Sequence, residues 1–180
     1  MTIYRDVSES SMFSMEIMWC YHAGLLQGWP DGTFRPLQLV NRDAAAAVMH
    51  RLAGQPHIPP GAGTFTDVAS GQQFAAEIEW VHSRGLLTGW PDGTFRPVSP
   101  MLREACCVMF YRAAGSPAYT APATSPLSDI NTDYQFYREV CWAWSQGIIT
   151  GYQDGTVQPT SAVKRDAMAA FLYRFDQVTG

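Results

Sequence analysis

The stretch Gly-Leu-Leu-Gln-Gly-Trp-Pro-Asp-Gly-Thr-Phe-Arg-Pro at residues 24–36 decides how the rest of the chain is organised. It returns almost unchanged as Gly-Leu-Leu-Thr-Gly-Trp-Pro-Asp-Gly-Thr-Phe-Arg-Pro at 85–97. A looser copy, Gly-Ile-Ile-Thr-Gly-Tyr-Gln-Asp-Gly-Thr-Val-Gln-Pro, occupies 147–159. Self-similarity at a nearly fixed period of about 60 residues is the sequence signature of a repeat architecture. We therefore predict three copies of one structural unit.

Two connectors rich in Pro, Gly, Ala, Ser and Thr separate the predicted units. Such compositions disfavour helix and strand and are typical of extended linkers. We expect repeats at 1–54, 65–115 and 126–176, joined by linkers at 55–64 and 116–125 and folded as one compact domain.

Each unit is expected to form a helix, a structured loop and a second helix. In the first unit, apolar residues three and four positions apart predict a helix over about 13–23, which Gly24 ends with a left-handed cap. The loop is expected to turn at its Asp-Gly pair, where Gly32 takes positive φ. The second helix is predicted over about 41–53, with Asn41 as its side-chain N-cap.

Composition limits the class of protein. The 180 residues are 47% hydrophobic and 13% aromatic, which is enough apolar material for a core. Twelve basic and 16 acidic residues give a net charge of −4, whereas nucleic-acid and anionic-membrane binders rely on a positive field. No apolar run approaches the roughly 20 residues of a membrane span. We therefore expect no nucleic-acid partner and no membrane span.

The cysteines and the first residues give weaker signals. The four cysteines form neither a C-x-x-C pair nor a zinc-like spacing with histidine, so we expect buried, apolar thiols. The Asp-Gly loops lack the alternating acids of a calcium loop, and we expect no metal or cofactor. The first residues contain no apolar targeting segment, which favours a cytoplasmic protein or a piece of a larger one. The cysteines are Cys20, Cys106, Cys107 and Cys141.

One arginine recurs at the start of each second helix. A guanidinium is a planar fork that matches a carboxylate through two parallel hydrogen bonds, so these arginines are candidates for binding an acidic ligand. The alternative interpretation is a structural ion pair with a nearby acid. The three residues are Arg42, Arg103 and Arg165.

The loops supply a second set of candidates. An exposed Asp oxygen accepts sugar hydroxyls, a Gly lets the backbone approach a ligand, and an aromatic side chain offers a flat face to a sugar ring. Alternatively, the Asp-Gly pairs serve only the turn and the aromatic residues only the core. The candidates are Asp31, Gly32, Asp92, Gly93, Asp154, Gly155, Trp29, Trp90 and Tyr152.

The order and spacing of these motifs resemble those of the surface-layer homology (SLH) family. The family repeat combines a Phe-x-Asp-Val/Ile opening, a helix, the loop motif quoted above, and a second helix that begins with an Arg. The openings here are Phe-Thr-Asp-Val at 65–68 and Leu-Ser-Asp-Ile at 127–130, with Tyr-Arg-Asp-Val at 4–7 as a variant. The resemblance covers nearly the whole chain, three times at the right spacing.

The resemblance implies a mainly α fold in which three helix-loop-helix repeats close into a pseudo-threefold prism around a central three-helix bundle. It also implies grooves between the repeats that bind secondary cell-wall polysaccharide, often through pyruvylated sugars. Such modules are not catalysts, and they anchor larger bacterial surface proteins. The implied location is therefore extracellular, in the cell wall or S-layer.

The chain departs from the family pattern at two places. The family's second helix typically opens Ile-Thr-Arg-Ala-Glu, whereas here the acid follows the Arg directly. The third loop lacks the Trp, Pro, Phe and Arg of the other two and has Tyr152, Gln153, Val157 and Gln158 instead. The main alternative function is a structural or protein-interaction module with the arginines in internal ion pairs. A choline- or sugar-binding aromatic solenoid is disfavoured, because such proteins repeat much shorter β-hairpin units.

Overall fold

The computed structural model describes residues 3–58 and 63–180. Residues 1–2 of the predicted first repeat and 59–62 of the predicted linker lie outside the described residues. Within the described ranges the secondary structure consists of helices, with only isolated β-bridges between repeats. The mainly helical class predicted from the sequence is confirmed. The helices are α1 (Ser14–His22), α2 (Arg42–Leu52), α3 (Ala75–Ser83), α4 (Arg103–Ala113), α5 (Tyr137–Ser145) and α6 (Arg165–Thr179).

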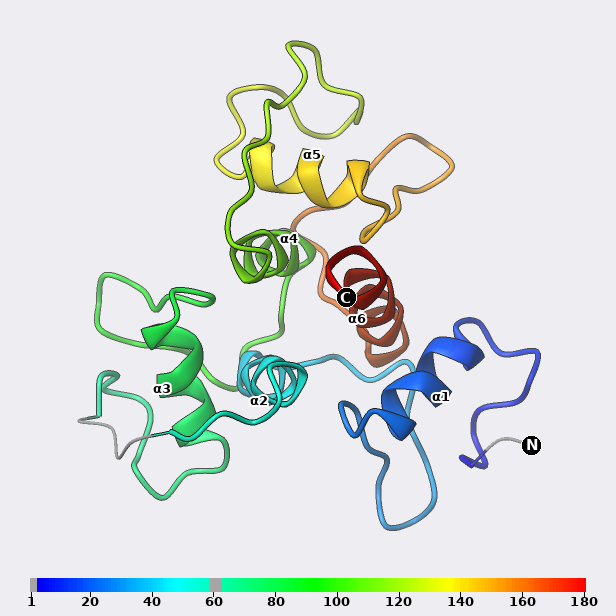
Figure 1. Ribbon diagram of the computed structural model, residues 1–180, viewed down its shortest axis with the longest axis vertical. Helices are drawn as coiled ribbons and strands as arrows, with labels where there is room; N and C mark the ends of the chain where they lie inside the picture. Colours follow the sequence, from blue (N-terminus) through cyan, green and yellow to red (C-terminus); the bar gives the residue numbers. More distant parts are fainter. Residues whose placement is uncertain (1–2, 59–62) are drawn as a thin grey trace.

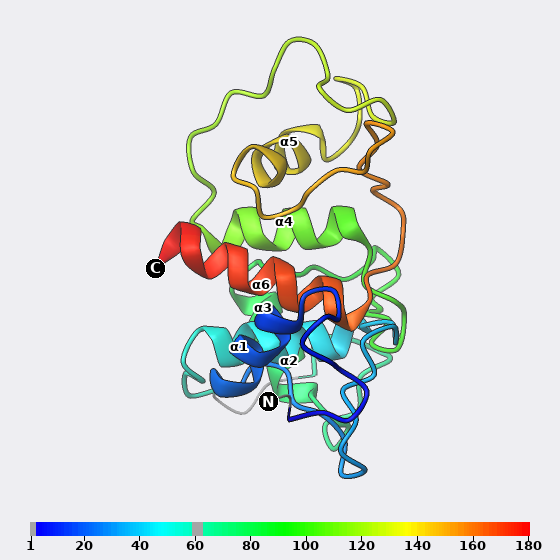
Figure 2. The same ribbon diagram turned by 90° about the vertical axis from the view of Figure 1, so that its right-hand side faces the viewer.

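The second helix of each repeat lies at the centre of the molecule. Figure 1 shows α2, α4 and α6 grouped in the middle, with α1, α3 and α5 outside them. Each outer helix packs on the central helix of the preceding repeat: α3 on α2, α5 on α4, and α1 on α6. Figure 2 shows the longer α6 running beside α4. The α1–α6 contact joins the first repeat to the last, so one kind of junction occurs three times.

An aromatic pair lies at each of these junctions. A Trp from the outer helix meets a ring of the central helix edge-on, with centroids 5.2 to 5.4 Å apart. Edge-to-face pairs add about 0.5–1.5 kcal/mol to the free energy gained by burying the rings. The pairs are Trp19–Tyr173, Trp80–His50 and Trp142–Tyr111.

The four cysteines are buried and unpaired, as the sequence predicts. The Cys20 thiol lies 3.8 Å from the Ala169 carbonyl oxygen, across the junction between α1 and α6. Burial raises the pKa of Cys20 and Cys106 to about 12, so these thiols stay protonated at neutral pH. They act as small apolar residues of the core.

The start of α2 differs from the prediction. Asn41 occupies the N-cap position of α2, but its side chain makes no capping hydrogen bond. The Arg42 amide donates instead to the Ser99 carbonyl oxygen at 3.0 Å, and the Asp43 amide to the Pro97 carbonyl oxygen at 3.0 Å. The acceptors for the other central helices are Ser161 and Pro159 for α4, and Gln38 and Pro36 for α6. The unpaired first-turn amides are therefore satisfied by the backbone of the next repeat, which makes the capping an inter-repeat contact.

The linkers are held by side chains of the helices. His50 Nε2 lies 2.8 Å from the Pro56 carbonyl oxygen, and the Tyr111 hydroxyl donates to the Pro117 carbonyl oxygen at 2.8 Å. The predicted linker at 116–125 contains no helix, in agreement with its composition.

Close packing explains why a glycine precedes the loop aromatic residue. A Cβ placed on Gly89 would lie 2.3 Å from Phe65 Cε1 and 2.5 Å from the Thr94 carbonyl oxygen. In the third repeat, a Cβ on Gly151 would lie 3.0 Å from the nearest atom, a carbonyl oxygen, and 3.8 Å from Leu127 Cδ2. The glycine is therefore needed most where the opening segment of the repeat supplies an aromatic ring.

This packing predicts that Gly89→Ala destabilises the protein more than Gly151→Ala does. Forcing a methyl group against a ring and a carbonyl oxygen should lower the free energy of unfolding by about 1–3 kcal/mol, which is the usual cost of overpacking. Urea unfolding followed by circular dichroism measures both variants. An equal cost at the two positions would contradict the packing described for Phe65.

Candidate functional site

Each recurring arginine binds the loop of the next repeat. Arg42 Nε donates to the Phe95 carbonyl oxygen at 2.9 Å, and its Nη2 donates to the Thr88 carbonyl oxygen at 2.8 Å. The equivalent bonds, at 2.7 to 2.8 Å, run from Arg103 to Val157 and Thr150, and from Arg165 to Phe34 and Gln27. Because Arg165 reaches the first repeat, these contacts also connect the last repeat to the first.

The three guanidinium groups are buried among aromatic rings. Arg42, Arg103 and Arg165 are 7%, 7% and 9% exposed. The Arg42 guanidinium lies 4.4 Å from the ring centroid of Trp90 and 4.5 Å from that of Phe95. Burial lowers the pKa of Arg42 and Arg165 to about 10, which still leaves both charged at neutral pH.

These arginines have no carboxylate partner in the described part of the chain, where the ion pairs involve other arginines. The internal ion pairs expected by the structural alternative are therefore not found. Backbone carbonyl oxygens and aromatic rings take their place, since a buried cation can be satisfied by hydrogen bonds and by the negative faces of rings.

The loop aspartates close the turn from within. Asp31 Oδ1 accepts hydrogen bonds from the Thr33 amide at 3.0 Å and from the Thr33 hydroxyl at 2.6 Å. Its Oδ2 pairs with the exposed Arg35 at 3.1 Å. Asp92 and Asp154 make the same bonds to Thr94 and Thr156. The glycines that follow have φ of 77°, 80° and 80°, as predicted for Gly32, Gly93 and Gly155.

A carboxylate that the sequence analysis did not single out holds each loop in place. Asp67 Oδ1 and Oδ2 accept hydrogen bonds from the Phe95 and Arg96 amides, both at 2.7 Å. Arg96 itself has φ of 57°, an uncommon conformation that these bonds stabilise. Asp6 and Asp129 do the same in the other repeats. The sequence does contain a pattern that indicates this role, because an Asp occurs in every opening segment and always at the same number of residues before its loop.

The loop aromatic residues fall into two kinds. The rings of Trp29 and Trp90 each contact two guanidinium groups of the chain, all at 4.4 Å from the ring centroid. Within the part of the chain that the structure describes, Tyr152 contacts one guanidinium group, that of Arg103, at 5.1 Å from the ring centroid, and it is 46% exposed. The third loop therefore presents the most accessible aromatic face of the three.

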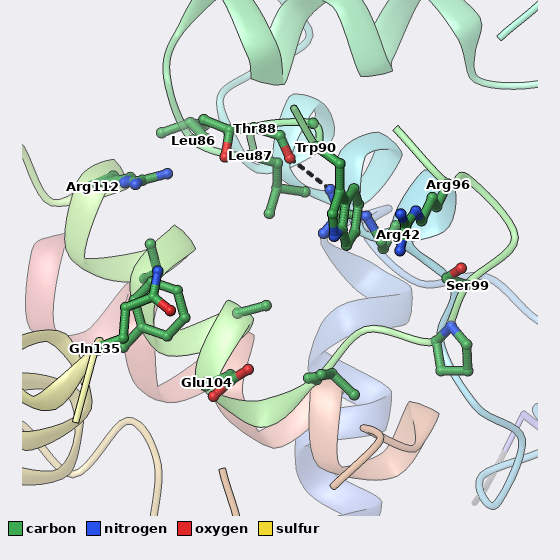
Figure 3. Close-up of a pocket in the computed structure, with 16 residues that line it drawn as sticks. Arg42, Leu86, Leu87, Thr88, Trp90, Arg96, Ser99, Glu104, Arg112 and Gln135 are labelled. Carbon is green, nitrogen blue, oxygen red and sulfur yellow. Dashed lines mark hydrogen bonds between the residues drawn. The ribbon is translucent and has the colours of Figure 1, made fainter. Parts of the chain in front are cut away.

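A groove of about 600 Å³ lies beside the second loop. Figure 3 shows Arg42 bonded to Thr88 next to Trp90, with Arg112 and Gln135 on the opposite side. The wall contains one acid, Glu104, whose carboxylate accepts a hydrogen bond from the Tyr134 hydroxyl. All three repeats contribute to the lining: the first through Arg42, the second through residues that include Trp90, Arg96, Glu104 and Arg112, and the third through Gln135 and Phe136.

The structure thus brings some of the predicted residues together and leaves others apart. Arg42 and Trp90 line the groove, whereas Asp92 and Gly93 lie in the same loop outside its lining. Across 3–58 and 63–180, no cluster of three or more His, Cys, Asp or Glu is placed to hold a metal ion. The helices of these ranges are all too short or too polar to cross a bilayer.

The buried bonds of Arg42 predict that Arg42→Met destabilises the fold. The substitution keeps much of the apolar stem but leaves two partly buried carbonyl oxygens without a donor, which should cost about 1–3 kcal/mol. Arg96→Gln is the control, because the Arg96 side chain is 46% exposed and should contribute little. Chemical denaturation of both variants measures the difference; equal stabilities would show that the bonds to the next repeat are unimportant.

The bonds around Asp31 predict an acid-resistant loop. Hydrogen bonds from Thr33, assisted by Arg35, lower the pKa of Asp31 to about 2, against about 3.9 in an unfolded chain. Because the folded-state pKa is the lower one, this carboxylate adds stability above about pH 4 and loses that contribution as the pH falls through 2. Carboxyl-carbon NMR titration should find the low midpoint, and Thr33→Val should raise it. An unshifted midpoint in the parent chain would contradict the turn geometry.

Comparison with known proteins identifies the repeats. The family model for the S-layer homology domain matches three segments, residues 3–46, 64–105 and 126–169. Each segment contains an opening motif, an outer helix, a loop and the start of a central helix.

Two curated relatives come from Acetivibrio thermocellus. Cell surface glycoprotein 1 is 30% identical in an alignment of 168 residues that covers 85% of this chain and 7% of that protein. A cellulosome-anchoring protein is 31% identical in an alignment of 160 residues that covers 85% of this chain and 35% of that protein. An endoglucanase of a Bacillus species is 27% identical over 117 residues, 61% of this chain and 11% of its own length. The chain thus spans about a third or less of these relatives.

The matches support a cell-surface anchoring module and a location in the cell wall or surface layer. The three matched segments cover most of the sequence, and each falls on one of the structural repeats. The chain therefore belongs to the S-layer homology domain family.

Proposed function

We propose that this chain is a non-catalytic anchoring module whose inter-repeat grooves bind an anionic secondary cell-wall polysaccharide. The observation that carries the proposal is the lining of the groove beside the second loop, which includes three arginines, Arg42, Arg96 and Arg112, and one acid, Glu104. The groove therefore has a local excess of positive charge, although the chain as a whole has a net charge of −4. An anionic ligand is attracted to such a cleft even on an acidic protein.

The shape and polarity of the groove also suit a carbohydrate. The lining combines polar side chains such as Ser99 and Gln135 with apolar ones such as Leu87 and Phe136, and sugar rings use both hydrogen bonds and apolar contacts. A polymer can enter more than one groove of the same molecule. Binding at a second groove then benefits from a high effective concentration, so modest contacts add up to firm anchoring.

A carboxylate is the acidic group that best fits the proposal. Guanidinium groups bind carboxylates with two parallel charge-assisted hydrogen bonds, and a pyruvate ketal on a sugar supplies one. The proposed ligand is therefore a pyruvylated polysaccharide. The residues proposed to form the glycan site are the loop and helix-start positions named from the sequence, including those of the third loop.

A structural role for the buried arginines is favoured by one specific observation. Arg42, Arg103 and Arg165 all use Nε and Nη2 to hold carbonyl oxygens of the adjacent repeat. This role is compatible with anchoring, because the same bonds fix the loop that forms the groove wall.

The proposal predicts that the purified chain co-sediments with bacterial cell-wall sacculi and binds their isolated polysaccharide. Chemical removal of the acidic substituents should weaken binding about tenfold or more, because charge-assisted hydrogen bonds contribute roughly 1.5–3 kcal/mol each. The untreated and treated polymers form a matched pair for isothermal titration calorimetry.

Two results would contradict the proposal in different ways. Absence of binding to any wall polysaccharide would overturn anchoring through carbohydrate. Equal binding to the treated and untreated polymers would overturn only the anionic part. A folded Arg42→Ala, Arg103→Ala double variant, checked by circular dichroism, should bind the untreated polymer more weakly than the parent.

A further inference from the structure

The exposed loop arginines are the candidates best placed for direct contact with an acidic ligand. The residue two positions after the Thr of the Asp-Gly-Thr turn is Arg35 in the first loop, Arg96 in the second and Gln158 in the third. We propose that Arg35 and Arg96, and not the buried arginines at the helix starts, bind the acidic group of the polymer beside the first and second loops. This inference rests on the function proposed above and assigns the residues that give it specificity.

The hydrogen bonds of the two kinds of arginine point to this assignment. Arg42 is 7% exposed, and two of its three nitrogens are committed to backbone carbonyl oxygens. A bidentate bond to a ligand through that edge would break the contact between repeats. The Arg96 side chain is 46% exposed and lines the groove, and its Nη1 makes no hydrogen bond within the described residues. A carboxylate can therefore reach Arg96 without disturbing the fold.

The loop holds the Arg96 guanidinium ready for a ligand. Its backbone is fixed by the bond from its amide to Asp67, and its guanidinium lies 4.4 Å from the Trp90 ring centroid. A further bond runs from Nε to the Thr94 hydroxyl at 3.3 Å. Side chains that are already ordered lose less conformational entropy on binding, so a long arginine held in this way is a better ligand contact than a free one. The first loop repeats the arrangement with Arg35 over Trp29 at 4.4 Å.

The ion pair with the loop aspartate does not block this role. Arg96 and Asp92 share one bond of 3.1 Å, and both side chains are about half exposed. Exposed, single-bond ion pairs contribute little to stability, so water or a ligand carboxylate replaces Asp92 at small cost. Asp92 also keeps its two bonds to Thr94 when Arg96 turns to a ligand.

The third loop provides a natural comparison. Gln158 cannot carry charge, and Tyr152 is left with one guanidinium neighbour. The third repeat instead has an exposed Lys164 at the N-cap of α6, where the second repeat has Leu102 in the groove lining. A lysine is a flexible point charge without the planar fork of arginine. We therefore expect the third groove to discriminate least between acidic and neutral forms of the polymer.

The test is a double variant that copies the third loop, Arg35→Gln with Arg96→Gln. Calorimetric titration with wall polysaccharide, before and after removal of its acidic substituents, should show that the parent prefers the acidic form about tenfold or more. The double variant should lose most of this preference, while binding the neutral form like the parent. Its melting temperature should stay within a few degrees of the parent value. Gln158→Arg should increase the preference.

Further variants keep the result interpretable. Arg35→Lys with Arg96→Lys preserves charge and should retain an intermediate preference, and it replaces the glutamine variant if that one is unfolded by circular dichroism. Lys164→Leu copies the second repeat and should change the preference less than the double glutamine variant. A parent that binds no wall polysaccharide contradicts the proposed function. Two results overturn this inference alone, provided that the parent chain prefers the acidic form. One is a folded double glutamine variant with the same preference as the parent. The other is a larger loss of preference in Lys164→Leu than in the double glutamine variant.

Discussion

Three buried guanidinium groups connect the repeats of this protein. Each leaves the start of a central helix and donates two hydrogen bonds to the loop of the next repeat, and Arg165 makes this contact between the last repeat and the first. The first amides of the same helices bind carbonyl oxygens just beyond that loop. Burying a charge costs free energy unless its hydrogen bonds are satisfied. Because the acceptors of each buried arginine lie in the next repeat, these contacts fix the position of one repeat relative to the next.

Different residues of the groove hold the loop in place and line the open space. The buried arginines and the Asp of each opening segment hold the loop in place, and the exposed Arg96 lines the groove. The loop tryptophan lies between the two sets of arginines, because Trp90 contacts both the buried Arg42 and the exposed Arg96. The third repeat keeps the shaping contacts but lacks the exposed arginine, which shows that the fold does not depend on it.

Local features of the structure could be predicted from the sequence, because they depend on residues close together in the chain. The helix bounds agree with the predictions to within a residue or two, and Gly24 and Gly32 take the positive φ expected of them. Features that depend on a partner in another repeat could not be predicted. Asn41 looked like a side-chain cap, but the neighbouring backbone satisfies the helix instead. The arginines were recognised as important, yet a repeated pattern does not reveal which repeat each one reaches or that its acceptors are carbonyl oxygens.

Closure of the chain onto itself is tested most directly by a distance between its first and last helices. Spin labels on the exposed positions Met15 in α1 and Val178 in α6, each changed to Cys, report this distance by double electron–electron resonance. Since α1 packs on α6, one short and narrow distribution is expected, and Arg165→Met should broaden it. A long, broad distribution in the otherwise unaltered chain would mean that the repeats form an open array and that Arg165 does not join the two ends.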